Sequence, residues 1–166
     1  MSTYENRLKA INWEKYRTAY GVATKVPDQL RQLASTDAKE ALHATHELWC
    51  GLCHQHVQIG SAALPALPFI LQVLDTASEQ MTIELLDILL GFAIGVNRQK
   101  VLDYQLSLGR KDIVPEEQWV TDLRIALNNQ LPRFKSLAFS SNDEIADLAS
   151  DIVAELESPQ GWEKDI

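Results

Sequence analysis

Apolar residues recur every three or four positions along nearly the whole chain, and this spacing limits the possible folds more than any other feature. It is the period of an α-helix that buries one side. Within 38–54, for example, Leu42, Thr45, Trp49 and Leu52 follow one another at such steps. Val, Ile and Thr never alternate with polar residues for long enough to indicate a half-buried strand. The sequence therefore predicts an all-α protein.

Start and end signals divide this pattern into helices. Short polar side chains cap the first free N–H groups of a helix, and proline suits its first turn. We expect a first helical region over 4–20 in two parts, with Asn12 capping the second part and Gly21 ending it. Further helices are expected from Pro27, over 38–54, from a cap at Ser61, and over 79–96, 116–128, 131–138 and 142–156. The segment 97–117 breaks the pattern and should be irregular or partly helical.

Three short segments share a Leu or Val followed by proline, at Pro27, Pro68 and Pro132. Each is followed by a polar turn and then by a longer amphipathic helix. Pro27 and Pro68 lie 41 positions apart, which is the period of HEAT and armadillo units, roughly 40–47 residues. Pro68 and Pro132 lie 64 positions apart, and the surplus of 23 is matched by the irregular segment 97–117.

This repeat predicts a right-handed α–α superhelix of about three HEAT-like helix pairs in a single domain, because one pair cannot bury its apolar face alone. A non-repetitive helical bundle is the alternative. The predicted parts are an N-terminal helical cap over 4–26, repeat 1 over 27–60, repeat 2 over 61–96, an insertion over 97–117, repeat 3 over 118–157 and a tail over 158–166.

Two stretches resemble small bacterial HEAT-repeat proteins. The first is Trp13 followed by Ala19-Tyr20-Gly21 and Val26-Pro27-Asp28-Gln29-Leu30. The second is Glu47-Leu48-Trp49 followed by Leu52-Cys53-His54-Gln55 and Ala66-Leu67-Pro68-Phe69-Ile70-Leu71. The resemblance covers about the first 95 residues and only loosely the C-terminal third; residues 56–59 depart from it, where a small turn with glycine is expected. HEAT-like proteins act as binding scaffolds, so the resemblance implies a binding function.

The net charge of −8, from 23 acidic and 15 basic residues, limits the partners. Non-specific nucleic-acid binding and binding to anionic membranes both depend on Lys and Arg. The charge also argues against a function as a HEAT-like DNA glycosylase, because such an enzyme needs a basic concave face. A protein partner, basic rather than acidic, agrees better with this charge.

The sequence also indicates a cytoplasmic location. The first residues contain no basic region followed by an apolar run, as a signal peptide would. The apolar stretch near 83–96 is interrupted by Glu84, Asp87, Gly91 and Gly95, and it is too short to span a bilayer. The two cysteines are therefore expected to be reduced.

Cys50, Cys53 and His54 match the C-x-x-C-H pattern of covalent haem attachment. No export signal accompanies the motif, although haem attachment usually requires export. The same two cysteines could form a thioredoxin-like redox pair, but such a pair lies at the start of a helix, where the dipole lowers the thiol pKa. Here the motif lies late in a predicted helix, where the dipole has the opposite effect. No cofactor is therefore expected.

A metal site is a further interpretation of the residues on the same predicted helix. His43, His46, Cys50 and Cys53 share one narrow stripe of it. Neighbouring pairs such as His46 and Cys50 could bind zinc with help from another helix. All four cannot reach one ion, because the stripe is roughly 15 Å long at about 1.5 Å per residue. Alternatively, the cysteines are small core residues and the histidines line a groove.

The helices over 38–54, 79–96 and 142–156 should form the concave face of the superhelix. On or beside it, Glu47, Glu84 and Asp87, with the basic Arg98 and Lys100 of the insertion, are the candidate binding residues. The leading interpretation is a non-enzymatic protein-binding scaffold or adaptor with an acidic concave face. The alternatives are an immunity-type protein that neutralises a toxin, a HEAT-like bilin lyase, and a metal-binding regulatory protein.

Catalysis has little support in the sequence, although it is not excluded. Carboxylate pairs such as Glu116-Glu117 and Asp143-Glu144 fall at predicted helix starts, where the helix dipole favours them. No Gly-rich phosphate loop and no H-E-x-x-H motif is present. Trp162, in the predicted tail, is a further candidate anchor for a partner.

Overall fold

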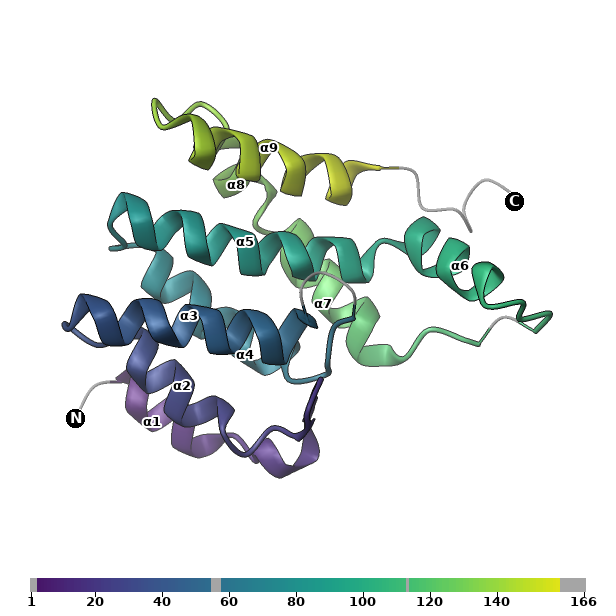
Figure 1. The fold of residues 1–166 in the computed structure, drawn as a ribbon, viewed down its shortest axis with the longest axis horizontal. Helices are drawn as coiled ribbons and strands as arrows, with labels where there is room; N and C mark the ends of the chain where they lie inside the picture. The colour runs from purple at the N-terminus through teal and green to yellow at the C-terminus, as the bar shows by residue number, and fades with distance from the viewer. Residues whose placement is uncertain (1–2, 55–57, 113, 159–166) are drawn as a thin grey trace.

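The computed structural model describes residues 3–54, 58–112 and 114–158, and within these residues the chain is mainly helical (Figure 1). Residues 159–166, including Trp162, and the side chains of Arg98 and Gln99 lie outside this description. The α-helices are α1 Thr3–Ala10, α2 Val26–Leu33, α3 Ala38–Cys53, α4 Ala63–Leu74, α5 Glu79–Val96, α6 Arg98–Ser107, α7 Gln118–Asn128, α8 Leu131–Leu137 and α9 Asp143–Glu157. A 3₁₀ turn, η1 Trp13–Lys15, precedes two short antiparallel strands, β1 Arg17–Thr18 and β2 Gly21–Val22.

The three longest helices, α3, α5 and α9, each begin at a side-chain cap. Asp37 accepts the backbone N–H of Lys39 at 3.0 Å, Ser78 that of Met81 at 3.2 Å, and Asn142 that of Glu144 at 3.1 Å. Such caps pair N–H groups that the helix itself leaves without partners. The predictions of helices over 38–54, 79–96 and 142–156 are confirmed, and α5 has the predicted bounds.

The long helices α3, α5 and α9 lie side by side, with α5 in the middle (Figure 1). We call these three helices the acidic row. The shorter helices pack against the row: α2 on α3, α4 and α7 on α5, and α8 on α9. Because α5 has neighbours on both sides and beneath, its buried residues include Leu85, Leu89 and Phe92.

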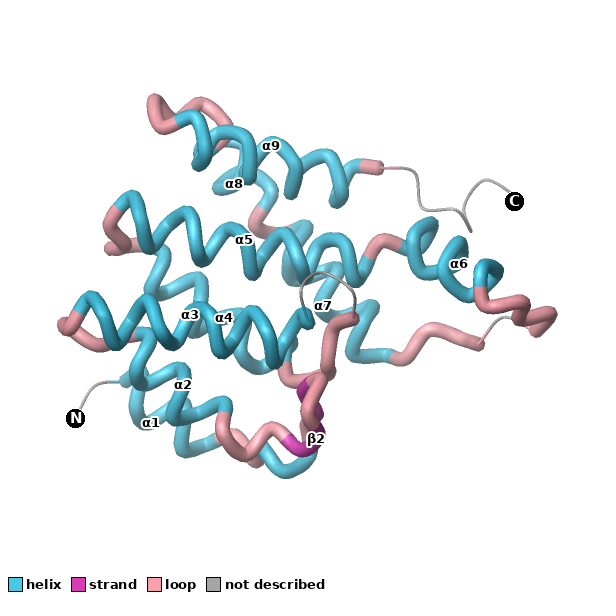
Figure 2. The backbone as a smooth tube through the Cα atoms, in the orientation of Figure 1, coloured by secondary structure: helices cyan, strands magenta, loops and turns pink. Residues whose placement is uncertain are grey.

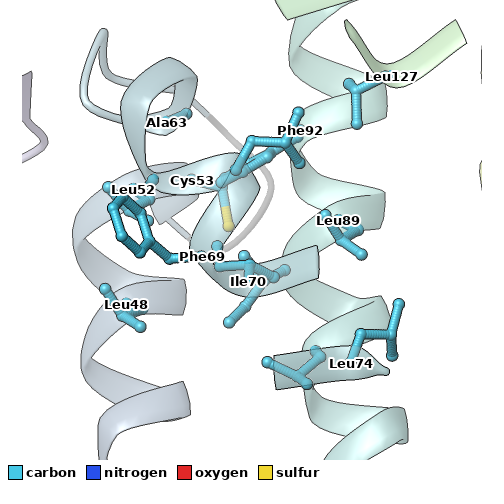
Figure 3. Packing of buried hydrophobic residues seen from close by; sticks show 14 of the residues in the cluster. Leu48, Leu52, Cys53, Ala63, Phe69, Ile70, Leu74, Leu89, Phe92 and Leu127 are labelled. Atoms are coloured by element: carbon cyan, nitrogen blue, oxygen red, sulfur yellow. The ribbon is translucent and has the colours of Figure 1, made fainter. Parts of the chain in front are cut away.

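The core extends through the whole helical array, and one part of it lies where α3, α4, α5 and α7 meet (Figure 3). Phe92 of α5 and Leu127 of α7 belong to this part of the core, together with Cys53 of α3 and Ile70 of α4. Truncating a large core residue of this kind to alanine costs about 3–5 kcal/mol.

The N-terminal region differs from the prediction of a helix over 4–20. Helix α1 ends at Ala10, and Asn12 caps only the 3₁₀ turn, accepting the N–H of Glu14 at 3.2 Å. The chain then forms the β1–β2 hairpin (Figure 2). Long-range bonds hold this hairpin: the N–H of Arg17 donates to the Ser61 hydroxyl at 2.9 Å, and the N–H of Ala62 donates to the Arg17 carbonyl at 3.0 Å.

The sequence suggested that Ser61 caps α4. The same contacts explain why it does not. Its hydroxyl accepts the N–H of Arg17, and α4 begins without a side-chain cap. Proline lies in the first turn of α2 and α8, as expected, but Pro68 lies inside α4. The predicted break over 97–117 is partly helical: α6 is followed by a loop that leads to α7 (Figure 2).

Candidate functional site

The acidic row contains eleven carboxylate side chains and one basic side chain, Lys39. The carboxylates are Glu40, Glu47, Glu79, Glu84, Asp87, Asp143, Glu144, Asp147, Asp151, Glu155 and Glu157. The other six α-helices have the opposite balance, with four acidic and eight basic residues. The excess of negative over positive charge on the helices is therefore confined to three neighbouring helices.

The carboxylates that face solvent are spread over the middle and edge helices of the row. Glu84 on α5 and Asp147 and Asp151 on α9 are exposed. Asp87, one helical turn after Glu84, is half-buried. Residues three or four positions apart lie on one side of a helix. The exposed stripe of α5 is thus acidic, and so is that of α9.

Other predicted binding residues are held by contacts within the chain. Glu47 accepts a hydrogen bond from the Gln29 amide of α2 at 3.0 Å, and it lies 2.5 Å from Nε2 of His43. Lys100 forms an ion pair with Glu155 of α9. The structure brings Glu84 and Asp87 together on α5, whereas Glu47 belongs to the α2–α3 contact and Lys100 to the α6–α9 contact.

The predicted His/Cys stripe divides into separate environments. His43 pairs with Glu47, and His46 places Nε2 3.8 Å from Sγ of Cys50. Cys53 is fully buried, and its thiol donates to the Trp49 carbonyl at 3.2 Å. Among the described residues, no three His, Cys, Asp or Glu side chains come close enough to hold a metal ion. A metal at His46 and Cys50 would need ligands from outside this chain.

A cavity of about 650 Å³ lies between the C-terminal end of α5, helix α6, the loop after it and the start of α7. We call it the α6 groove. Its apolar walls come from the segment before α4, from α5, from α6 and from α7, and include Ile59, Ile94, Val101 and Trp119. Helix α6 extends beyond the end of α5 at one side of the molecule (Figure 1).

A buried charge network supports this groove from α7. The side chain of Arg124 is 9% exposed, and its Nε donates to the Val96 carbonyl at the end of α5 at 2.8 Å. Its Nη1 donates to Glu116 at 2.9 Å, and Thr121 donates to the same carboxylate at 2.6 Å. Arg124 thus satisfies a terminal carbonyl of α5 and fixes the position of Glu116, which lines the groove.

Sequence reasoning had not singled out this arginine. The available signal was its position: Arg124 directly follows Leu123 and precedes Leu127 by three residues, and both leucines are fully buried. A charged residue on the buried side of a helix requires a partner. The partner itself could not be identified, because Val96 is 28 residues away in the chain.

No helix within the described segments combines the length and the apolar character that crossing a bilayer would require.

Comparison of the chain with known protein families, with curated proteins and with solved structures finds no match.

Proposed function

We propose that the chain is a non-enzymatic protein-binding scaffold, and that the acidic row is the surface that meets a basic partner. The observation that carries the proposal is the uneven distribution of charge: eleven acidic residues and one basic residue on α3, α5 and α9. Such a surface attracts a positive partner and repels an acidic one. A toxin with a basic surface, held by this chain as an immunity-type protein, is one partner of this kind.

We further propose that the fold is a HEAT-like superhelix. The pairs α2–α3, α4–α5 and α8–α9 would be its units, because each short helix packs on the long helix that follows it. The long helices then occupy the second position of each pair, where solenoids present their binding face. The position of Pro68 inside α4 departs from the simplest form of this repeat.

A charge-neutralised variant tests the binding surface. Four exposed or half-exposed carboxylates of the row are replaced by amides: Glu84→Gln, Asp87→Asn, Asp147→Asn and Asp151→Asn. Binding of a lysine- and arginine-rich peptide of about 20 residues is measured by calorimetry at low and at physiological ionic strength. We expect the variant to bind at least about tenfold more weakly, which corresponds to about 1.4 kcal/mol.

The matched control removes the same number of charges outside the row, at Glu14, Asp103, Asp112 and Asp122, which are all exposed. Both variants have the same net charge, so a difference between them depends on where the charges lie. Equal weakening in the two variants would contradict a binding surface on the row. In the host, a physiological partner should be captured by the wild type and the control and lost by the row variant.

A further inference from the structure

We propose that the α6 groove binds a small organic anion with an apolar or aromatic body, and that Arg110 pairs with its anionic group. This site is separate from the acidic row: the row is proposed to bind a positively charged partner, whereas the groove binds a negatively charged ligand.

The size and lining of the groove suit a small ligand. Its volume of about 650 Å³ falls within the roughly 300–1,000 Å³ of ligand pockets. Three large apolar side chains on its lip are exposed to an unusual degree: Tyr104 by 58%, Leu108 by 53% and Val114 by 49%. Apolar surface gathered in this way marks interaction sites more often than an isolated exposed residue does.

The charges of the groove favour an anion. Of its two carboxylates, Glu116 is bound by Arg124 and Thr121, and Glu117 accepts a hydrogen bond from the Trp119 indole. Of its two cations, Lys100 pairs with Glu155. The Arg110 side chain is exposed and forms no ion pair or side-chain hydrogen bond within the described part of the chain. Among the described side chains of the groove, a ligand thus meets one unpaired guanidinium, and this group binds carboxylate, sulfonate or phosphate well.

Backbone hydrogen bonds at the end of α6 fix the position of the Arg110 main chain. Helix α6 ends in a Schellman motif: the N–H of Gly109 donates to the Leu106 carbonyl at 3.0 Å, and that of Arg110 donates to the Gln105 carbonyl at 3.3 Å. Gly109 has a φ of 73°, which glycine adopts without strain. The Gln105 amide then accepts the N–H of Val114 at 2.9 Å and ties the loop to the helix.

A second hollow provides an internal comparison. It has a volume of about 390 Å³ and lies between the α2–α3 and α4–α5 turns. Tyr4, Gln72 and Met81 are among its lining residues, and none of the described residues that line it is charged. An anionic probe should therefore distinguish the two cavities.

The test uses the fluorescent probe anilinonaphthalene sulfonate, which combines an aromatic body with one anionic group. We expect one probe to bind per chain with saturation. Arg110→Gln should weaken binding about tenfold, because the hydrogen bonds from the charged guanidinium to the anion are lost, and Arg110→Lys should retain most of the affinity. Lys111→Gln is the matched control, since Lys111 is the exposed neighbour of Arg110 and does not line the groove.

Competition identifies the chemistry of the ligand. Decanoate should displace the probe at concentrations at least about tenfold lower than decanol, which has the same chain length without the charge. Near-ultraviolet circular dichroism checks that every variant keeps its native packing. The proposal fails if the probe does not saturate, if Arg110→Gln and Lys111→Gln bind it equally, or if decanol competes as well as decanoate.

Discussion

Cys50 and Cys53 lie three residues apart on α3, but their surroundings are very different. Cys50 is half-buried beside His46 at the surface, whereas Cys53 is fully buried in the hydrophobic core (Figure 3). The spacing of a C-x-x-C motif therefore conceals one accessible and one inaccessible thiol.

This difference predicts two rates of reaction with a thiol reagent such as Ellman's reagent. One thiol per native chain should react rapidly, and the second only after denaturation, because a thiol must be reached by solvent to react. Cys50→Ser should remove the rapid phase, and Cys53→Ala should leave it unchanged. Two equally fast thiols in the native protein would contradict the buried position of Cys53.

Two glycines should respond in opposite ways to alanine. A Cβ at Gly60 would lie 2.4 Å from the Arg17 carbonyl oxygen, so Gly60→Ala should push β1 away and lower the free energy of unfolding by about 1–3 kcal/mol. Among the described residues, a Cβ at Gly51 would meet only Thr18, at 3.9 Å. Because Gly51 is inside α3, Gly51→Ala should raise the free energy of unfolding by up to about 1 kcal/mol. Urea denaturation of both variants measures these changes. A lower free energy of unfolding in both variants would contradict the predicted difference between the two glycines.

At the scale of elements, the sequence predicts best where the signals are local. The bounds of α5 follow from the cap at Ser78 and the apolar run after it, and α9 follows in the same way from Asn142. The β1–β2 hairpin could not be predicted, because two-residue strands have no period to detect and their partners, Gly51, Ser61 and Ala62, are distant in the chain.

For the candidate sites too, local features could be predicted from the sequence, whereas contacts between distant residues could not. The break over 97–117 pointed to the region of the α6 groove, but the walls that come from Ile59, Ile94 and Trp119 depend on tertiary packing. Which carboxylates are free and which are paired also depends on that packing. Neither could be read from the spacing of residues.

One residue joins three helices at the base of α6. Asn97 is 3% exposed, and its amide donates to the Glu155 carboxylate at 2.9 Å and contacts the Ser158 hydroxyl at 2.6 Å, while its carbonyl accepts the N–H of Lys100 at 3.3 Å. It therefore connects the end of α5 and the start of α6 to the end of α9.

Asn97→Ala should lower the free energy of unfolding by about 1–3 kcal/mol, the cost of leaving buried polar groups unpaired. Hydrogen exchange should become faster in the last turn of α9. Asn12→Ala is the control, because Asn12 is exposed and caps only the short 3₁₀ turn. If both variants lose the same stability, Asn97 does not act as this connection.

For the whole molecule, the concentration of carboxylates on the acidic row should make stability depend on salt. Like charges on neighbouring helices repel one another, and about 0.1 M salt screens charges beyond about 10 Å. We expect the melting temperature to rise between about 10 and 150 mM NaCl. Replacing the four row carboxylates by amides should remove most of this rise. A melting temperature that falls over this range would mean that the ion pairs outweigh the repulsion.

The unequal charge of the helices also gives the molecule an electric dipole moment, because the centres of negative and positive charge do not coincide. A freely rotating body with such a moment turns in the field of a charged object before the two surfaces touch. Beside a positively charged protein, the most probable orientation at first encounter therefore presents α3, α5 and α9. Collisions that would otherwise be random in orientation become biased toward one side of the molecule.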